Sequence, residues 1–73
     1  MQKNLYNIYD KQTKSYQNPL VFLNHADAMR WFTTIVNDHE RQGLTYKYPE
    51  QFILMFIGTL DDQTNELKMI IKN

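Results

Sequence analysis

The sequence predicts an α+β fold in which one amphipathic helix packs on a small antiparallel sheet, with the elements in the order β-β-α-β-β. Three features carry this prediction. Apolar residues recur at helical spacing after Asn24, residues 52–60 have the composition of a strand, and a turn-rich loop joins that run to a second apolar segment at residues 67–72. The chain has 73 residues, so we expect a single domain spanning residues 1–73.

The N-terminal part of the chain changes from strand-like to loop-like composition. Residues 3–10 are rich in Tyr, Ile and Leu and predict the first strand. Residues 11–19 are polar and end in Asn18 and Pro19, which predicts a loop. The short apolar segment at residues 20–23 then predicts either a second strand or an extended cover segment.

The predicted helix covers residues 25–41. Asn24 is a suitable N-cap, and Asp27 places an acidic group near the positive end of the helix. Gly43 is the natural stop. Met29 lies at the shoulder of an apolar stripe whose members recur at helical spacing: Ala28, Phe32, Ile35, Val36 and His39.

The C-terminal part predicts a β-hairpin. Residues 43–49 read as a loop with two tyrosines, and residues 52–60 as the third strand. Residues 61–65 are turn formers, and residues 67–72 form the last strand, antiparallel to the third. Gly58 within the third strand indicates a bulge or a close backbone approach.

The third strand is apolar on both sides, because alternate side chains face opposite sides of a sheet. One side carries Phe52, Leu54, Phe56 and Leu60, and the other carries Ile53, Met55 and Ile57. A single helix covers only one side, so we expect a second copy or another protein to cover the other, with Ile53, Met55 and Ile57 as the interface core. The alternative is that residues 20–23 and the tyrosine-rich loops fold over that side.

Composition narrows the function classes. The chain has no cysteine, which removes disulfides and zinc–thiolate sites and agrees with a reducing cytoplasm. Eight basic and eight acidic residues give a net charge of zero, which argues against strong, sequence-blind DNA binding by a monomer. The longest apolar run, residues 52–57, is far shorter than the roughly 18 residues of a membrane span, so we expect a soluble intracellular protein.

Catalytic and metal-binding motifs are not evident. The sequence has no recognisable nucleophile motif and no glycine-rich phosphate loop, so we predict that the protein is not an enzyme and uses no cofactor. His25 and His39 would lie about 21 Å apart on one helix, too far to share a metal ion. Residues 61–66 partly match a calcium loop, but Glu66 stands where glycine is needed, so a solvated hairpin loop is the better interpretation.

Two segments interleave basic and aromatic residues, a pattern typical of surfaces that bind single-stranded nucleic acid. The first holds Tyr9, Lys11, Lys14 and Tyr16, and the second holds Tyr46, Lys47 and Tyr48. Arg30 and Trp31 have the same character on the predicted helix. The alternative interpretation is that the tyrosines pack at the edge of the core with solvated hydroxyls, while the lysines only solvate a loop.

Several short motifs follow one another in an order that resembles a known phage family. They are Tyr9-Asp10, Asn18-Pro19, the helix stripe ending in Asn37-Asp38, Lys47-Tyr48-Pro49-Glu50 with Phe52, and Gly58-Thr59-Leu60-Asp61-Asp62. In order and spacing they resemble the small nonstructural protein of gokushovirus-type microviruses, phages with single-stranded circular DNA genomes. The resemblance spans about residues 6–67. Gln51 replaces an acid and Asn65 replaces a turn glycine, and Asn tolerates the left-handed backbone that such a glycine supplies.

The resemblance implies a DNA-binding accessory protein that takes part in viral single-stranded DNA replication or genome synthesis in the host cytoplasm. We expect a homo-oligomer, because repeated weak surfaces would compensate for a neutral monomer, with single-stranded DNA and host or viral replication proteins as further partners. The candidate nucleic-acid contacts are Lys11, Lys14, Tyr16, Arg30 and Lys47. The rival hypothesis is a non-enzymatic module that binds a host or viral protein through an apolar sheet face.

Overall fold

The computed structural model describes residues 1–37 and 48–70 of the chain. In chain order the elements are β1 (Gln2–Asp10), β2 (Ser15–Tyr16), β3 (Leu20–Phe22), α1 (His25–Val36), the 3₁₀ turn η1 (Pro49–Gln51), β4 (Phe52–Asp61) and β5 (Leu67–Met69). The α+β class predicted from the sequence is confirmed. The predicted order β-β-α-β-β is matched only in part, because β2 lies inside the segment that was expected to be a loop.

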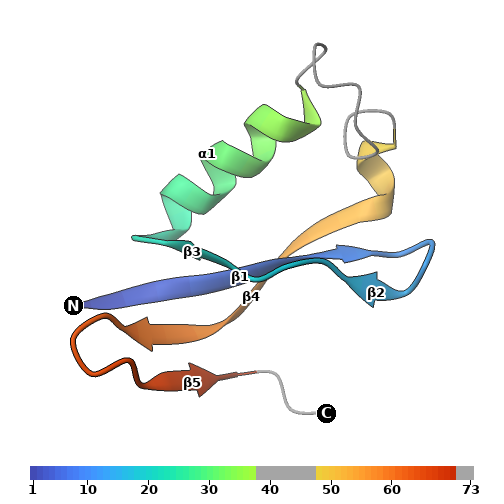
Figure 1. The fold of residues 1–73 in the computed structure, drawn as a ribbon. Helices are drawn as coiled ribbons and strands as arrows, with labels where there is room; N and C mark the ends of the chain where they lie inside the picture. Colours follow the sequence, from blue (N-terminus) through green and yellow to red (C-terminus); the bar gives the residue numbers. More distant parts are fainter. Residues whose placement is uncertain (38–47, 71–73) are drawn as a thin grey trace.

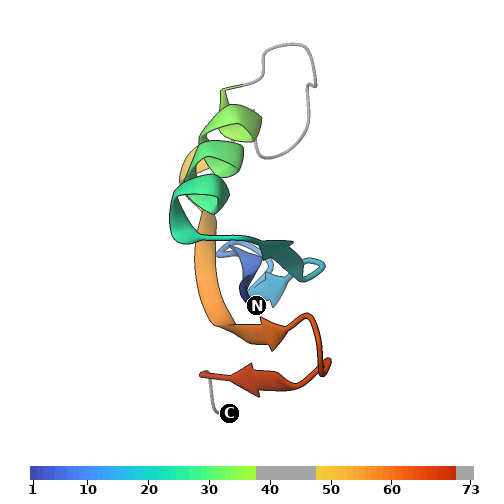
Figure 2. The ribbon, with the colours of Figure 1, turned by 90° about the vertical axis from the view of Figure 1, so that its left-hand side faces the viewer.

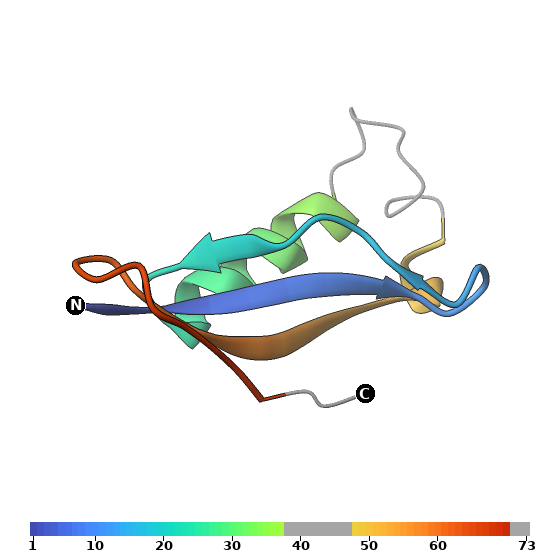
Figure 3. The same ribbon diagram turned by 60° about the horizontal axis from the view of Figure 1, so that its bottom comes forward.

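One antiparallel sheet joins the described strands, and β1 and β4 form its long central pair (Figure 1). The strand order is β2-β1-β4-β5, and β3 also pairs with β1. β1 pairs with β4 along its whole length, from Gln2 opposite Asp61 to Asp10 opposite Phe52. The β1–β2 turn therefore lies at one end of the sheet, and the β4–β5 turn lies beside the N-terminus at the other end (Figure 3).

α1 begins at the predicted residue. Asn24 has an extended backbone, and its Oδ1 accepts a hydrogen bond from the backbone N–H of Asp27 at 2.8 Å. This contact satisfies one of the N–H groups that a helix leaves unpaired at its start.

α1 ends at Val36, earlier than the predicted end at residue 41. The C-cap is Asn37, whose backbone N–H donates to the Thr34 carbonyl oxygen at 3.3 Å. Its side-chain amide also donates, to the Thr33 carbonyl oxygen at 2.9 Å, so one residue satisfies two of the last helical carbonyls. The predicted stop at Gly43 and the stripe residue His39 lie outside the described residues.

The helix covers one face of the sheet. Ile35 of α1 is buried against Ile8 of β1 and Phe52 of β4. Partly buried apolar side chains from both layers surround this cluster: Trp31, Phe32, Val36 and Leu54. The predicted helical stripe therefore supplies the core that joins the helix to the sheet.

Tyr6 is the most buried large side chain, at 1% exposure, and it links β1 to the start of α1. Its hydroxyl lies 3.2 Å from Nδ1 of His25 and accepts a hydrogen bond from Nδ2 of Asn4 at 3.1 Å. The ring contacts Phe22 and Phe56, with centroids 5.9 Å and 5.5 Å away. A buried hydroxyl is stable here because both its neighbours are polar.

A β-bulge interrupts the pairing of β1 with β4. Tyr6 lies opposite Phe56, but the preceding residue Leu5 lies opposite Gly58, so Ile57 is an extra residue on β4. The sequence predicted a bulge or a close backbone approach at Gly58, and both occur. A Cβ built on Gly58 would lie 2.2 Å from the backbone carbonyl oxygen of Lys68.

The bulge also changes which side chains of β4 face the helix. On the N-terminal side of the bulge, Phe52, Leu54 and Phe56 share the helix-facing side with Tyr6 and Ile8. Beyond it, Leu60 lies opposite Lys3 and shares the helix-free side with Leu5. The prediction that Leu60 faces the same side as Phe52 is therefore wrong, because one inserted residue reverses the alternation.

The sheet curls so that the β4–β5 hairpin lies on the side of β1 opposite α1. In Figure 2, α1 is at the top, β1 with β2 and β3 is in the middle, and the end of β4 with β5 is at the bottom. Leu5 and Ile57 are buried under this curl, at 6% and 7% exposure. The β4–β5 hairpin thus covers part of the sheet side that was expected to contact a partner. β3 pairs with β1 instead of folding over that side.

The β4–β5 hairpin forms as predicted, with a shorter second strand. β5 ends at Met69, although the next residue, Ile70, still donates its N–H to the Ile57 carbonyl oxygen at 2.9 Å. Residues 71 and 72 of the predicted strand lie outside the described residues. Asn65 has a φ of 62°, so it does supply the left-handed turn position. Among the described residues, no helix is both long and apolar enough for a bilayer span.

Candidate nucleic-acid interface

The β1–β2 hairpin holds three of the five residues that the sequence singled out for nucleic-acid contact. Its turn covers residues 11–14. Oδ1 of Asp10 accepts hydrogen bonds from the backbone N–H groups of Gln12 and Thr13, at 2.9 and 3.3 Å. Lys14 closes the turn with a left-handed φ of 56°. The turn is therefore shaped by the Asp10 carboxylate as well as by strand pairing.

Two backbone hydrogen bonds fix the base of this hairpin to the sheet. The N–H of Lys11 donates to the Gln51 carbonyl oxygen at 2.8 Å, which connects the hairpin to η1. The N–H of Gln17 donates to the Ile8 carbonyl oxygen at 3.0 Å, which continues the pairing beyond β2. The side chains of the hairpin consequently start from a fixed backbone.

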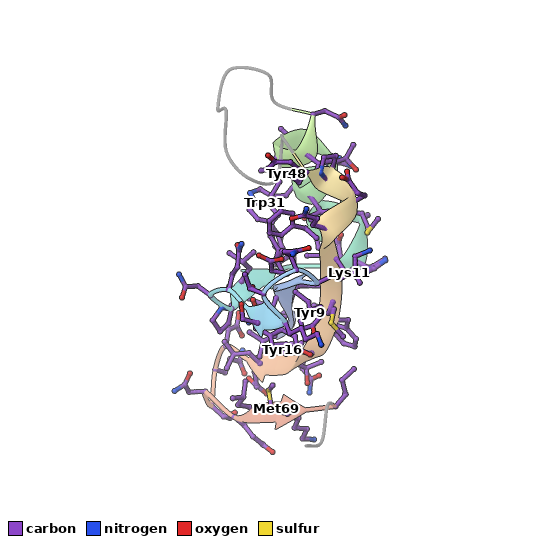
Figure 4. The ribbon with its side chains drawn as sticks, turned by 90° about the vertical axis from the view of Figure 1, so that its right-hand side faces the viewer. Tyr9, Lys11, Tyr16, Trp31, Tyr48 and Met69 are labelled. Carbon is purple, nitrogen blue, oxygen red and sulfur yellow. The ribbon has the colours of Figure 1, made fainter. Side chains whose placement is uncertain are left out.

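Tyr9 and Tyr16 form an aromatic pair across β1 and β2. The two residues are direct strand partners, and their ring centroids lie 4.9 Å apart with an interplanar angle of 55°. Tyr16 is 50% exposed. In Figure 4 both tyrosines lie on the side of the sheet away from α1 and Trp31, toward Met69 of β5. Tyr9 supports the exposed ring of Tyr16, so the structure adds Tyr9 to the site.

Lys11 and Lys14 add two positive charges to the same turn. Both side chains are exposed, and in the described part of the chain neither forms an ion pair with an acidic group. A half-exposed aromatic ring on a hairpin whose turn carries two lysines can stack on a base while the charges contact phosphates. The hairpin therefore has the chemistry of a small single-strand binding surface.

The other two predicted contacts are not part of this surface. Arg30 belongs to α1, and Figure 4 shows α1 with Trp31 on the opposite side of the sheet from Tyr16. The guanidinium of Arg30 is 3.7 Å from the carboxylate of Asp27. Lys47 lies outside the described residues, as does Tyr46. Tyr48 is exposed just before η1. The structure thus groups Lys11, Lys14 and Tyr16 and separates them from Arg30.

The acidic loop at residues 61–66 is a structured turn. Oδ1 of Asp61 accepts hydrogen bonds from the N–H groups of Gln63 and Thr64, at 2.9 and 3.3 Å, and these bonds lower the pKa of the Asp61 carboxyl. Asp62 pairs with the N-terminal ammonium at 2.9 Å, and the hydrogen bond to Asp62 raises the pKa of that ammonium. Within residues 1–37 and 48–70, no group of three His, Cys, Asp or Glu side chains could hold a metal ion.

The three predicted interface residues differ in exposure. Ile53 is 42% exposed, Met55 is half-buried, and Ile57 is buried within the single chain by the bulge and the curl. Ile57 therefore belongs to the core of the protomer, and only Ile53 and Met55 remain accessible to a partner. Sequence alternation alone could not distinguish them, because it treats the strand as regular.

Comparisons with known proteins identify a phage family. Residues 3–73 match the family described as "Phage ORF5 protein". Protein ORF5 of Chlamydia phage 1 is 34% identical over 58 residues, an alignment that covers 77% of this chain. The chain spans 60% of the length of that relative. No solved structure matches the chain significantly.

Proposed function

The chain belongs to the Phage ORF5 protein family, and on this premise we propose that it is a nonstructural phage accessory protein that binds single-stranded DNA through its β1–β2 hairpin. It would act during viral DNA replication or genome synthesis in the host cytoplasm, as the resemblance to gokushovirus-type proteins implies. The family description names no enzymatic activity, and the proposed role requires none.

The observation that carries the proposal is the grouping of Tyr16, Lys11 and Lys14 on one fixed hairpin. Stacking of a base on an exposed aromatic ring contributes about 1–3 kcal/mol and requires a base that is free of its own stack. Duplex DNA presents phosphates but buries its base faces, so this surface favours a single strand. With only two lysines, we expect weak binding by one hairpin.

Fluorescence anisotropy with a labelled single-stranded oligonucleotide tests the proposal. We expect saturable binding that Tyr16→Ala weakens at least about fivefold, because a stacking contact is lost. Arg30→Gln is the matched control, since it removes an exposed positive charge from the other side of the sheet and should leave the affinity nearly unchanged.

Salt dependence gives a second readout of the same site. Each phosphate contact to a single strand contributes about −0.7 to the slope of log K against log salt concentration. We expect Lys11→Gln to reduce the magnitude of the slope by about this amount, and Arg30→Gln to leave it unchanged. Equal effects of the two substitutions, or no binding by a folded protein at low salt, would refute the hairpin as a DNA site.

A second candidate function is supported by the apolar residues on the surface. Val21, Ile53, Leu67 and Met69 are all more than 40% exposed, and the net charge is zero. These features favour a module that binds a host or viral protein. Such binding would be nearly independent of ionic strength, whereas DNA binding weakens steeply with salt, so the same titrations distinguish the two functions.

A further inference from the structure

One edge of β4 has backbone groups that no described strand pairs with. Antiparallel partners alternate between pairs that exchange hydrogen bonds and pairs that do not. Because the Lys11 N–H donates to the Gln51 carbonyl oxygen, Ile53 and Met55 are the β4 residues whose backbone groups point toward β1. The outer edge therefore carries the N–H and C=O groups of Leu54 and Phe56 and the C=O of Phe52, whose N–H donates to the Pro49 carbonyl oxygen of η1.

Other segments of the chain limit this outer edge at both of its ends. β5 pairs with β4 only at residues 58–60, and Ile70 extends that pairing to Ile57. At the other end, η1 stops the strand just before Phe52. The open window within the described structure is therefore residues 52–56.

The window lacks the features that protect strand edges. Natural edge strands carry charged side chains, proline or an outward bulge that prevents pairing with another strand. Residues 52–56 are Phe, Ile, Leu, Met and Phe, with no charge and no proline. Ile53 and Phe56 are 42% and 38% exposed, so the side chains beside the edge are accessible as well as apolar. An edge of this kind is a site for addition of another strand.

We propose that this edge pairs with the same edge of a second copy, in an antiparallel arrangement with a two-fold axis at Leu54. The axis would place Leu54 opposite Leu54 of the second copy and Phe52 opposite Phe56 of the second copy. Leu54 then exchanges two hydrogen bonds with its counterpart, and each Phe56 N–H donates to a Phe52 carbonyl oxygen. Because the Phe52 N–H already donates to the Pro49 carbonyl oxygen, the total is about four. The side chains of Ile53 and of Met55 of the second copy meet in the closer, non-hydrogen-bonded pair.

A second copy fits this edge for two reasons. The two-fold axis pairs apolar residues only, which leaves no buried charge unpaired. A two-fold interface also uses one patch on both copies, as closed homodimers do. The hairpin residues Lys11, Lys14 and Tyr16 lie outside this pairing, although Ile53 is the strand partner of Tyr9, so the two surfaces adjoin.

Disulfide trapping tests the predicted pairing. The sequence has no cysteine, so every disulfide in the experiment forms between introduced residues. We would mix the single variants Ile53→Cys and Met55→Cys under mild oxidation without DNA and measure cross-linked dimer by mass spectrometry. The Cα atoms of this pair would be about 4.5 Å apart, within the range that a disulfide bridges. We expect at least about tenfold more dimer than from Leu67→Cys mixed with Met55→Cys, because Leu67 lies on β5 and has no such partner.

A charge exchange tests the same register without a covalent bond. Ile53→Asp should shift the protein to a monomer in sedimentation velocity, and the double variant Ile53→Asp with Met55→Lys should restore the dimer, because each Asp would face a Lys of the second copy. The inference is overturned if the two cysteine mixtures cross-link equally, if neither cross-links, or if the wild-type chain is monomeric at all concentrations up to millimolar. DNA binding by a monomeric chain would leave the proposed function intact.

Discussion

At the level of single residues, Gly58 determines how closely β4 and β5 approach each other. Its backbone φ is not in the left-handed region, so conformational freedom does not explain it. A Cβ at this position would lie 2.2 Å from the Lys68 carbonyl oxygen and 3.1 Å from the Met69 Cα. These are backbone atoms, which cannot move away without separating the strands. Glycine is therefore required at position 58 because a side chain would not fit between the two strands.

We predict that Gly58→Ala destabilises the protein by at least about 2 kcal/mol, because the β4–β5 hairpin must open to admit the methyl group. Urea denaturation followed by circular dichroism measures the change. Thr59→Ala is the control, since it shortens the neighbouring side chain without adding an atom near β5. Equal stability of Gly58→Ala and the wild type would mean that the strands do not approach this closely in solution.

At the level of elements, the two hairpin turns share the same hydrogen-bond pattern. In each, an aspartate Oδ1 accepts hydrogen bonds from the N–H groups two and three residues later, and the residue after those is left-handed. The sequences are Asp10-Lys11-Gln12-Thr13-Lys14 and Asp61-Asp62-Gln63-Thr64-Asn65. Asn suits the left-handed position, whereas Lys adopts it at a cost of about 1 kcal/mol. A lysine at this strained position agrees with a functional role for its charge.

Replacing Lys14 by Asn should therefore stabilise the fold and weaken DNA binding at the same time. We expect a gain of about 1 kcal/mol in unfolding free energy and a salt slope smaller in magnitude by about 0.7. Thermal denaturation and the anisotropy titration measure the two effects. The reverse exchange, Asn65→Lys, should destabilise the second turn by a similar amount. An unchanged melting temperature in both variants would contradict the strain argument.

The turn at Asp61 should make stability depend on pH. Its carboxyl has a pKa below the ordinary value in the folded protein, so the folded state favours the ionised form. The resulting stabilisation is fully present above the ordinary carboxyl pKa and is lost as the pH falls through the lowered folded-state pKa. Asp61→Asn keeps the side-chain acceptor but not the charge, so the stability difference between wild type and variant should be positive at pH 7 and should decrease as the pH falls below the ordinary carboxyl pKa. A difference that is constant with pH, measured by urea denaturation, would exclude this contribution.

At the level of the whole molecule, the two proposed surfaces lie on different parts of the sheet. The β4 edge would join two protomers, and the β1–β2 hairpin lies at one end of the sheet, outside that edge (Figure 1). A dimer therefore carries two weak sites that one strand of DNA can engage together. Engagement of the second site is intramolecular, so affinity rises without any new contact.

This arrangement predicts binding that depends on DNA length and on dimerisation. The wild type should bind an oligonucleotide of about 30 nucleotides much more tightly than one of about 8, which occupies a single site. Ile53→Asp should remove most of this gain. Because Ile53 lies opposite Tyr9, the comparison uses the ratio of the two affinities and not the affinity for the short strand alone. Anisotropy with both oligonucleotides measures the ratio of the two affinities. An equal ratio for the wild type and Ile53→Asp would show that DNA binding does not depend on dimerisation.

Local sequence patterns determined the elements that depend only on residues close together in the chain. The N-cap at Asn24, the strand from Phe52 and the turn with left-handed Asn65 follow from capping, alternation and turn chemistry, and the structure contains all three. The grouping of Lys11, Lys14 and Tyr16 was also predictable, because they are close in sequence and their turn brings them together.

Tertiary structure alone decided the features that depend on pairing between distant segments. The bulge at Ile57, which turns Leu60 to the helix-free side and buries Ile57, appears only when β4 is placed in register with β1. The separation of Arg30 from the hairpin depends on the face of the sheet that α1 covers, and the open edge of β4 depends on where β5 stops pairing. Periodicity in a sequence describes a regular strand, whereas one inserted residue reverses the faces, so these outcomes are fixed by hydrogen bonds between strands far apart in the chain.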